Sequence, residues 1–423
     1  MSNAYVLDFS ALDAAPAHWD RRPLWTLIRR RDVTGRPDAE LLSVYRDHGV
    51  VPKSSRDDNF NKPSEDLSSY RYVRPGDLVL NKMKTWQGSL AVSQYEGIVS
   101  PAYFVCDLSP EVHPRFAHHL LRSRPYIHLY QAASKGIRPN QWDLPFEDFR
   151  ALPMLLPPLE EQRRIADFLD AETARIDKLV RLRSKQLSLI GEGLAVEAVS
   201  LTGRSQIRRG GGAVEDVTQL RRAAISTQTG STPANLHDLS DGSASEGGIP
   251  WYTPAAIDPW MSITGAEKAT HRDGIPLFPA GSVVITGIGE SLGKIAYLDH
   301  VATGNQQLTA ITPQVGVSGR FMAWQLWAAE REIREWAQYS RIRIINNDSL
   351  KSFPIYLPSR SEQDKVVRAL DSHMARVRQI TDAFLKFQRL ADERRQALIT
   401  ATVTGQFDVS TASGRNVTDG VTA

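Results

Sequence analysis

The stretch LPPLEEQRRIADFLDAETARIDKLVRLRSKQ, from Leu156 to Gln186, decides the fold because a second version of it follows later in the chain. The second version, LPSRSEQDKVVRALDSHMARVRQITDAFLKF, runs from Leu357 to Phe387 and aligns with the first without a gap. The pair Glu161-Gln162, for example, matches Glu362-Gln363. An internal duplication of this kind constrains the architecture before any motif is considered.

Both copies predict a long helix. Each follows a strand end that contains proline, begins with acidic residues that suit the positive end of a helix dipole, and stops at a glycine, Gly203 or Gly405. Each helix runs for roughly 40 residues, or about 60 Å at 1.5 Å per residue. The apolar residues recur in steps of three and four, at Ile165, Leu169, Ile176, Leu179, Leu187, Ile190 and Leu194, and at Val366, Leu370, Met374, Val377, Ile380, Phe384, Phe387, Ala391 and Leu398. We expect the two copies to pack on each other, rather than to be two unrelated core helices.

The segments before each helix are predicted to be two mixed domains of the α+β class. Short strands at irregular spacing alternate with helical patterns, and the second segment follows the plan of the first without its letters. PAGSVVI at 279–285 stands where PGDLVL stood at 75–80, and Arg320-Phe321 opens a helix as Arg115-Phe116 does. In the first domain, 114–130 is predicted to be one helix, and the segment after His18-Trp19 to contain a short helix. The predicted division is domain 1 at 1–155, helix at 156–204, domain 2 at 205–356, helix at 357–409 and a disordered tail at 410–423.

Composition narrows the class of protein. The 423 residues are 41% hydrophobic and 23% charged, as in ordinary globular proteins, and they carry a formal net charge of +3. A single cysteine, Cys106, excludes a disulfide framework and a cysteine-based zinc site. We find no apolar run long enough for a membrane span and no signal-peptide pattern at the N-terminus. These features predict a cytoplasmic protein.

Signatures of catalysis are weak or missing. TGIGESLGK at 286–294 has neither the first glycine nor the final Ser/Thr of a P-loop, so we interpret it as a glycine-rich turn between strands. His113, His118, His119 and His128 lack supporting cysteines, and polar positions with ordinary hydrogen bonds are favoured over a metal site. No nucleophile, nuclease or methyltransferase motif is found. The sequence therefore favours a binding or targeting role without a cofactor.

Basic, amide and aromatic residues gather on loops in both predicted domains. Arginine and lysine hold phosphates, and Arg, Lys, Asn and Gln also make paired hydrogen bonds to base edges. For any one of these residues a solvated surface position is the simpler interpretation. The hypothesis of a binding role depends on equivalent loops in the two domains carrying the same types of residue. The candidate DNA-binding residues are Lys53, Arg56, Lys82, Lys84, Trp86, Lys135, Arg138 and Asn140 in domain 1, and Ser291, Lys294, Arg341, Arg343 and Asn346 in domain 2.

The sequence resembles the specificity subunits of Type I restriction–modification systems. The resemblance is carried by the helix opening LPPLEEQRRIADFLDAETARID with its second copy LPSRSEQDKVVRALD, and in domain 1 by SVYRDHGVVPKSSRDDN and YRYVRPGDLVLNKMKTWQGSLAVSQYEGIVSPAYFV. Domain 2 adds TGSTPA and GGIPWYTPAAI. The second helix opening departs from the family pattern at Ser359-Arg360, where Pro-Leu is usual.

The resemblance implies two target-recognition domains, each of which reads one half of a bipartite, asymmetric site in double-stranded DNA. It implies that the long helices form an antiparallel coiled coil with pseudo-twofold symmetry and set the distance between the half-sites. It also implies two methyltransferase subunits as partners, restriction subunits in the full complex, and no catalysis by this chain. The alternatives are an enzyme with an unrecognised motif and a non-catalytic coiled-coil scaffold with two protein-recognition domains.

Overall fold

A computed structural model of the chain describes residues 9–56, 63–135, 142–208, 216–233, 239–241, 248–266, 268–271, 274–339 and 342–411. The chain divides into two compact units, unit 1 from residues 1–181 and 386–423 and unit 2 from residues 182–385. Each unit combines sheets and short helices with part of each long helix. None of the described helices is both long and apolar enough to span a membrane.

Unit 1 contains a four-stranded antiparallel sheet with the order β2 (Ile28–Arg30), β9 (Tyr103–Leu108), β6 (Leu78–Asn81) and β7 (Leu90–Val92). Side chains alternate between the faces of a strand, so the apolar run of β6 serves two cores. Its residues 78 and 80 join a core with a neighbouring helix, and residue 79 packs on the other face against a hairpin.

The remaining elements of unit 1 surround this sheet. The hairpin is β3 with β4, and the helix packed on the sheet is α2. The elements are α1 (Ser10–Asp13), β1 (Asp20–Pro23), η1 (Leu24–Thr26), β3 (Leu42–Tyr45), β4 (Gly49–Pro52), η2 (Lys53–Ser55), β5 (Arg71–Val73), η3 (Thr85–Gln87), β8 (Gly97–Val99), α2 (Pro114–Leu121), α3 (Arg124–Ala133), α4 (Phe146–Ala151), β10 (Pro153–Leu156) and η7 (Val409–Thr411).

One local prediction for this domain was wrong. The predicted helix at 114–130 is two helices, α2 and α3, because the chain becomes extended at Ser123 and Pro125 fits the first turn of a new helix. The short helix predicted after Trp19 is present as the single turn η1, and strand β1, which pairs with β10, precedes it.

Unit 2 repeats this plan in three dimensions. Its main sheet has the order β12-β19-β16-β17, and each strand occupies the chain position of its counterpart in β2-β9-β6-β7. The predicted match between 279–285 and 75–80 is confirmed, because these segments lead into β16 and β6. The elements of the unit are α6 (Arg204–Arg208), β11 (Val217–Gln219), η4 (Leu220–Arg222), β12 (Ala224–Thr229), β13 (Leu239–Asp241), β14 (Ile249–Tyr252), η6 (Pro254–Ala256), β15 (Lys268–Thr270), β16 (Val283–Thr286), β17 (Ile295–Tyr297), β18 (Thr303–Gly304), β19 (Leu308–Pro313), α7 (Gly319–Ala328), α8 (Glu330–Trp336), β20 (Gln338–Tyr339), β21 (Arg343–Ile344), α9 (Asn347–Lys351) and β22 (Pro354–Tyr356).

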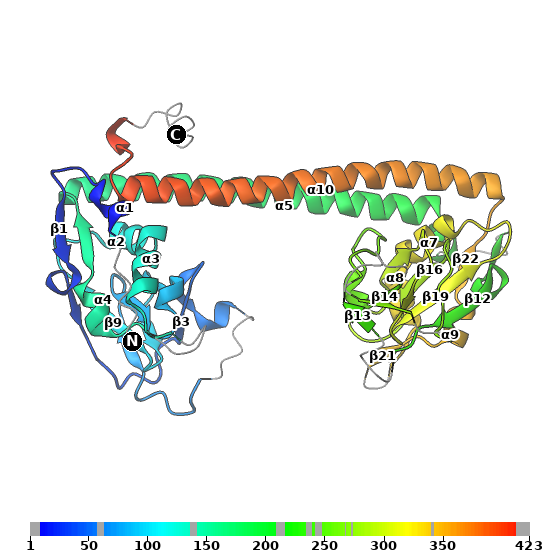
Figure 1. The fold of residues 1–423 in the computed structure, drawn as a ribbon, viewed down its shortest axis with the longest axis horizontal. Helices are drawn as coiled ribbons and strands as arrows, with labels where there is room; N and C mark the ends of the chain where they lie inside the picture. Colours follow the sequence, from blue (N-terminus) through cyan, green and yellow to red (C-terminus); the bar gives the residue numbers. More distant parts are fainter. Residues whose placement is uncertain are drawn as a thin grey trace. The chain divides into compact units, whose positions relative to one another are not determined.

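The duplicated stretches form two helices, α5 (Leu159–Leu201) of 43 residues and α10 (Arg360–Val403) of 44 residues. In unit 1 the first turns of α5 share a core with Leu398 near the end of α10, and in unit 2 the last turns of α5 share a core with Leu370 near its start. The helices therefore run antiparallel, as Figure 1 also shows. Ion pairs join them in each unit, Arg395 to Asp177 and His373 to Glu197. The predicted α+β fold with two long, mutually packed helices is confirmed.

The apolar stripe is buried toward the ends of the helices and exposed toward the middle. Ile165 and Leu169 on α5 are buried, whereas Leu179 is 47% exposed; on α10 Met374 is buried and Ile380 is 43% exposed. Both helices stop where the sequence predicted, with φ of 72° at Gly203 and 75° at Gly405. The chain after α10 packs in unit 1 on residues close to the N-terminus. Gly405 lies so close to Pro16 that a Cβ there would collide with it.

Candidate nucleic-acid interface

In unit 1 three of the predicted DNA-binding residues, Lys53, Arg56 and Lys84, line one cavity of about 900 Å³. One wall is the β3–β4 hairpin with the turn η2 that follows it, and the other is the turn after β6. The hydrophobic face of the hairpin is buried against the main sheet, so its turn and polar side chains are held at the cavity. The fold therefore brings together residues that lie far apart in the sequence.

The cavity combines positive charge with neutral hydrogen-bonding groups. Arg46 adds a fourth long cationic side chain to its lining, and Asp47 is the one carboxylate among the described lining residues. The Arg56 guanidinium lies 5.2 Å from the centre of the Tyr45 ring, a distance typical of a cation–π contact. Burial, together with the nearby Tyr45, raises the pKa of the Tyr103 phenol, which stays neutral. Such a lining suits phosphates and base edges. Its positive charge would also attract an acidic peptide, so charge alone does not separate nucleic acid from an acidic partner.

Three other predicted residues in domain 1 have partners within the domain. Lys82 Nζ lies 2.8 Å from Asp143 Oδ2, and Lys135 Nζ lies 2.7 Å from Asp148 Oδ2. Trp86 is half-buried, and its indole nitrogen donates to the Met83 carbonyl oxygen. Its ring also meets that of Trp142, at 5.2 Å between centroids. These contacts stabilise the loop, and a DNA contact by any of the three remains a prediction.

In unit 2 the predicted residues lie on two adjacent segments. The stretch 286–294 forms the connection between antiparallel strands β16 and β17, whereas a P-loop would lead into a helix, so the interpretation as a glycine-rich turn is confirmed. This turn carries Ser291 and the exposed Lys294. It lies beside β21 and its exposed Arg343, because Gly289 N donates to the Arg343 carbonyl oxygen at 3.1 Å.

Asn346 has a structural task that the sequence did not reveal. Its side-chain oxygen accepts a hydrogen bond of 2.8 Å from Ser349 N and caps the first turn of α9. The side-chain amide nitrogen remains the group of Asn346 that could donate to a base. Three predicted residues, Arg138, Asn140 and Arg341, lie outside the described residues, as does the tail from 412 onward.

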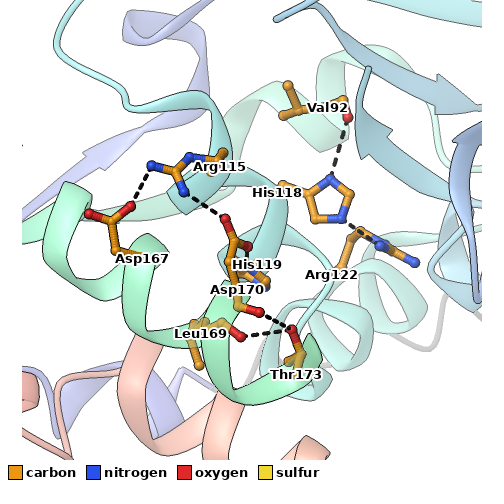
Figure 2. Close-up of polar contacts among 9 residues, drawn as sticks. All are labelled: Val92, Arg115, His118, His119, Arg122, Asp167, Leu169, Asp170 and Thr173. Carbon is orange, nitrogen blue, oxygen red and sulfur yellow. Dashed lines mark hydrogen bonds and ion pairs between the residues drawn. The ribbon is translucent and has the colours of Figure 1, made fainter. Parts of the chain in front are cut away.

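A polar joint fixes the domain-1 helix α2 to α5 (Figure 2). Arg115 Nη2 lies 2.6 Å from Asp167 Oδ1 and its Nη1 lies 2.7 Å from Asp170 Oδ2, while His119 Nε2 lies 2.7 Å from the other oxygen of Asp170. Burial alone would raise the pKa of Asp170, but the hydrogen bonds from His119 and Arg115 outweigh it and lower that pKa. Asp170 is therefore charged when it holds the joint.

Unit 2 has the equivalent joint at the equivalent aspartate. Arg320 Nε lies 2.9 Å from Asp371 Oδ1, and the Trp324 indole nitrogen donates to the same oxygen at 2.8 Å. A tryptophan thus stands where domain 1 has His119. The sequence matched Asp170 with Asp371 and Arg115 with Arg320, but it did not show that the arginines pair with the aspartates, which lie far away in the chain.

Comparisons with known proteins agree on one family. Residues 237–383 match the model of the Type I restriction modification DNA specificity domain. The Type I restriction enzyme EcoR124I/EcoR124II specificity subunit of Escherichia coli is 26% identical over 145 residues, which are 32% of this chain and 36% of that protein. The matched region thus spans about a third of the curated relative.

Two solved structures are similar along nearly the whole chain. One, from work on complex assembly and conformational transition of the type I R-M system, has a TM-score of 0.71 at 20% identity and covers 93% of this chain and 99% of its own. The other, the HsdS subunit from Thermoanaerobacter tengcongensis, has a TM-score of 0.51 at 18% identity and covers 93% and 98%. At these identities the structures establish the fold. Residues 237–383 are similar to the Type I restriction modification DNA specificity domain, and the resemblance of the chain to the specificity subunits of Type I restriction–modification systems is confirmed.

Proposed function

We propose that this chain is the non-catalytic DNA specificity subunit of a Type I restriction–modification complex. Domain 1, at 1–155, reads one half of a bipartite site in double-stranded DNA, and domain 2, at 205–356, reads the other. The helices at 156–204 and 357–409 set the distance between the half-sites and dock two methyltransferase subunits. Restriction subunits join in the full complex.

The observation that carries this proposal is a repeated scaffold with different loops. Both units share the sheet order and the aspartate joint to a long helix, yet the cationic residues differ in kind and position. Domain 1 offers Lys53, Arg56 and Lys84 around a cavity, and domain 2 offers Lys294 and Arg343 on a turn and an adjacent strand. Because base readout depends on the side chains that loops present, two such domains are expected to read two different half-sites.

The long helices offer a surface suited to further subunits. Leu182 and Leu189 on α5 are 55% and 57% exposed, and Leu385 on α10 is 49% exposed. Large apolar side chains repeated along exposed helix faces are typical of protein–protein contacts. This supports docking of the methyltransferase subunits on the helices.

The proposal is tested by co-expressing the chain with the methyltransferase encoded beside it and mapping methylated adenines by single-molecule sequencing. We expect one split motif with a fixed unread gap. Lys84→Ala should weaken methylation by about tenfold or more, since a good contact to a base or phosphate contributes roughly 1–3 kcal/mol. Arg124→Ala, at an exposed position on α3 outside the cavity lining, removes one positive charge as well and should leave methylation unchanged.

A stable complex that writes no methylation would reject the DNA-reading role and favour the scaffold with two protein-recognition domains. Equal losses for Lys84→Ala and Arg124→Ala would show that general charge, and not the cavity, governs binding.

A further inference from the structure

Helix α2 carries a second, partly buried polar pair on the side that faces the sheet. His118 Nδ1 lies 3.4 Å from the carbonyl oxygen of Val92 on β7, and His118 Nε2 lies 2.6 Å from Nη1 of Arg122, the residue directly after the helix. Figure 2 shows this pair pointing away from the joint that Arg115 and His119 make with α5. Because an arginine can only donate, His118 Nε2 accepts and the ring proton is on Nδ1.

Arg122 extends this chain of contacts to the wall of the cavity. Its Nη2 donates to the Arg46 carbonyl oxygen at 2.5 Å, at the start of the turn that joins β3 to β4. Gly49 completes the same turn with φ of 70°, and a Cβ there would lie 3.1 Å from Ala91 Cβ and 3.3 Å from His118 Cε1. The turn therefore sits directly on the pair, with no room for a side chain between them.

Domain 2 makes the same contact with different chemistry. Trp327 follows Arg320 by seven residues, as Arg122 follows Arg115. Its indole nitrogen donates to the Pro259 carbonyl oxygen at 2.9 Å. That carbonyl belongs to a turn whose buried Met261 has a positive φ of 61° and accepts a hydrogen bond from Tyr297 on β17. β17 is the counterpart of β7, so both turns lie between the equivalent strand and the equivalent helix.

We propose that Arg122, supported by His118, is a positioning residue for DNA recognition and governs the half-site read by domain 1. The inference rests on the proposed function. In both domains this helix binds a long helix through its first arginine, which pairs with Asp170 or Asp371, and binds a turn through a residue at its C-terminal end. In domain 1 that turn belongs to the β3–β4 hairpin, which carries Arg46 and Asp47 into the cavity lining. Base contacts tolerate only small displacements. When the hairpin is released from the helix, domain 1 should therefore lose its selectivity for bases before it unfolds.

The first test measures the hairpin itself by amide hydrogen exchange of the full chain. Arg122→Met keeps the length and apolar stem of the side chain but removes both hydrogen bonds. Exchange in peptides covering 42–52 should become about tenfold faster, as expected for the loss of hydrogen bonds from a charged donor. Arg124→Met, at an exposed arginine on α3, is the matched control and should leave these peptides unchanged.

The second test uses the complex with the methyltransferase and reads the methylated motif. Arg122→Met should relax base preference in one half-motif and leave the other intact. Unchanged exchange of the hairpin, or faster exchange with both half-motifs intact, would overturn the positioning role while the proposed function stands. A wild-type complex that writes no split motif would overturn the proposed function and, with it, the role of these residues in reading.

Discussion

At the scale of single residues, His118 is a histidine that the fold keeps uncharged. Burial lowers its pKa to about 3, and the positive charges of Arg122 and His119 act in the same direction. Its contact with the Val92 carbonyl oxygen and the more distant Asp170 favour the charged form only weakly. Protonation would place a cation against the Arg122 guanidinium, at the point where the hairpin turn rests.

This arrangement predicts an acid-sensitive unit 1. The unfolded chain binds a proton at His118 near pH 6.5, whereas the folded chain binds it only near pH 3, so the stabilisation is complete above pH 6.5 and is lost as the pH falls toward 3. At pH 5 the free energy of unfolding is lower by about 2 kcal/mol than at pH 7.5. The free energy of unfolding of His118→Gln should therefore differ less between pH 5 and pH 7.5 than that of the wild type.

The single cysteine makes this measurable for unit 1 alone. Cys106 is fully buried in the core of that unit, so its labelling by a dipyridyl disulfide in increasing urea reports unfolding there. His128→Gln, at an exposed histidine on α3, is the control and should keep the wild-type difference. If both variants behave alike, His118 is not the residue responsible.

The position of a candidate side chain could be predicted where a loop exposes it, but not where a residue far away in the sequence pairs with it. Lys53, Arg56 and Lys84 were predicted from their loops, and the fold gathers them around one cavity. Lys82 belongs to the same kind of loop, but Asp143 pairs with it. The pairing depends on the loop at 142–144 crossing back over the end of β6, which no local pattern in the sequence indicates.

At the scale of elements, each long helix is fastened at its start by one glutamine. Gln162 Oε1 accepts from His113 N at 2.8 Å, and its Nε2 donates to the carbonyl oxygens of Pro157 at 2.8 Å and Glu111 at 3.0 Å. Gln363 repeats two of these bonds, with Ser318 N and the Pro358 carbonyl oxygen. The duplicated Glu-Gln pair in the sequence was the visible trace of this joint.

Replacing this glutamine predicts a large loss of stability. Gln162→Leu fills the same space but leaves one buried N–H and two carbonyl oxygens without their partner, at a cost of about 2–4 kcal/mol in the free energy of unfolding. Gln131→Leu, at an exposed position on α3 in the same unit, should change it by less than about 0.5 kcal/mol. Urea unfolding followed through Cys106 compares the two, and equal midpoints would contradict the role given to Gln162.

The helices also show where periodicity stops being informative. The steps of three and four correctly located the long helices and many of their buried positions. They did not distinguish Leu169, which is buried, from Leu179, which is exposed. Leu169 packs on residues of domain 1 as well as on the partner helix, whereas Leu179 belongs to no buried cluster and is 47% exposed. Sequence periodicity reports that a face is apolar, and only the arrangement of neighbours determines how much of it is covered.

At the scale of the whole molecule, the duplication extends beyond the stretches whose letters match. The order β2-β9-β6-β7 recurs as β12-β19-β16-β17, although the two domains differ in sequence. The matched positions are those that join the domains to the helices, at Gln162 with Gln363 and Asp170 with Asp371. A shared joint with divergent loops allows each domain to change what it binds without altering how it is held.

The continuity of α5 and α10 through both units leads to a prediction about target spacing, which rests on the proposed function. Each helix passes from one compact unit to the other, between 181 and 182 in α5 and between 385 and 386 in α10. Seven residues inserted at both points preserve the contacts within each unit and the helical periodicity. They lengthen the helices by about 10 Å, which corresponds to about three base pairs of duplex.

We therefore expect the methylated motif to keep both half-sites and to gain about three unread base pairs between them. Single-molecule sequencing of methylated genomic DNA reads this gap directly. The same seven residues inserted in α5 alone are the control, because the helices then lose their register and the variant should lose methylation instead of gaining a longer gap. An unchanged gap written by a stable complex of the doubly extended chain would show that the distance between half-sites is set by contacts elsewhere, and not by the helices.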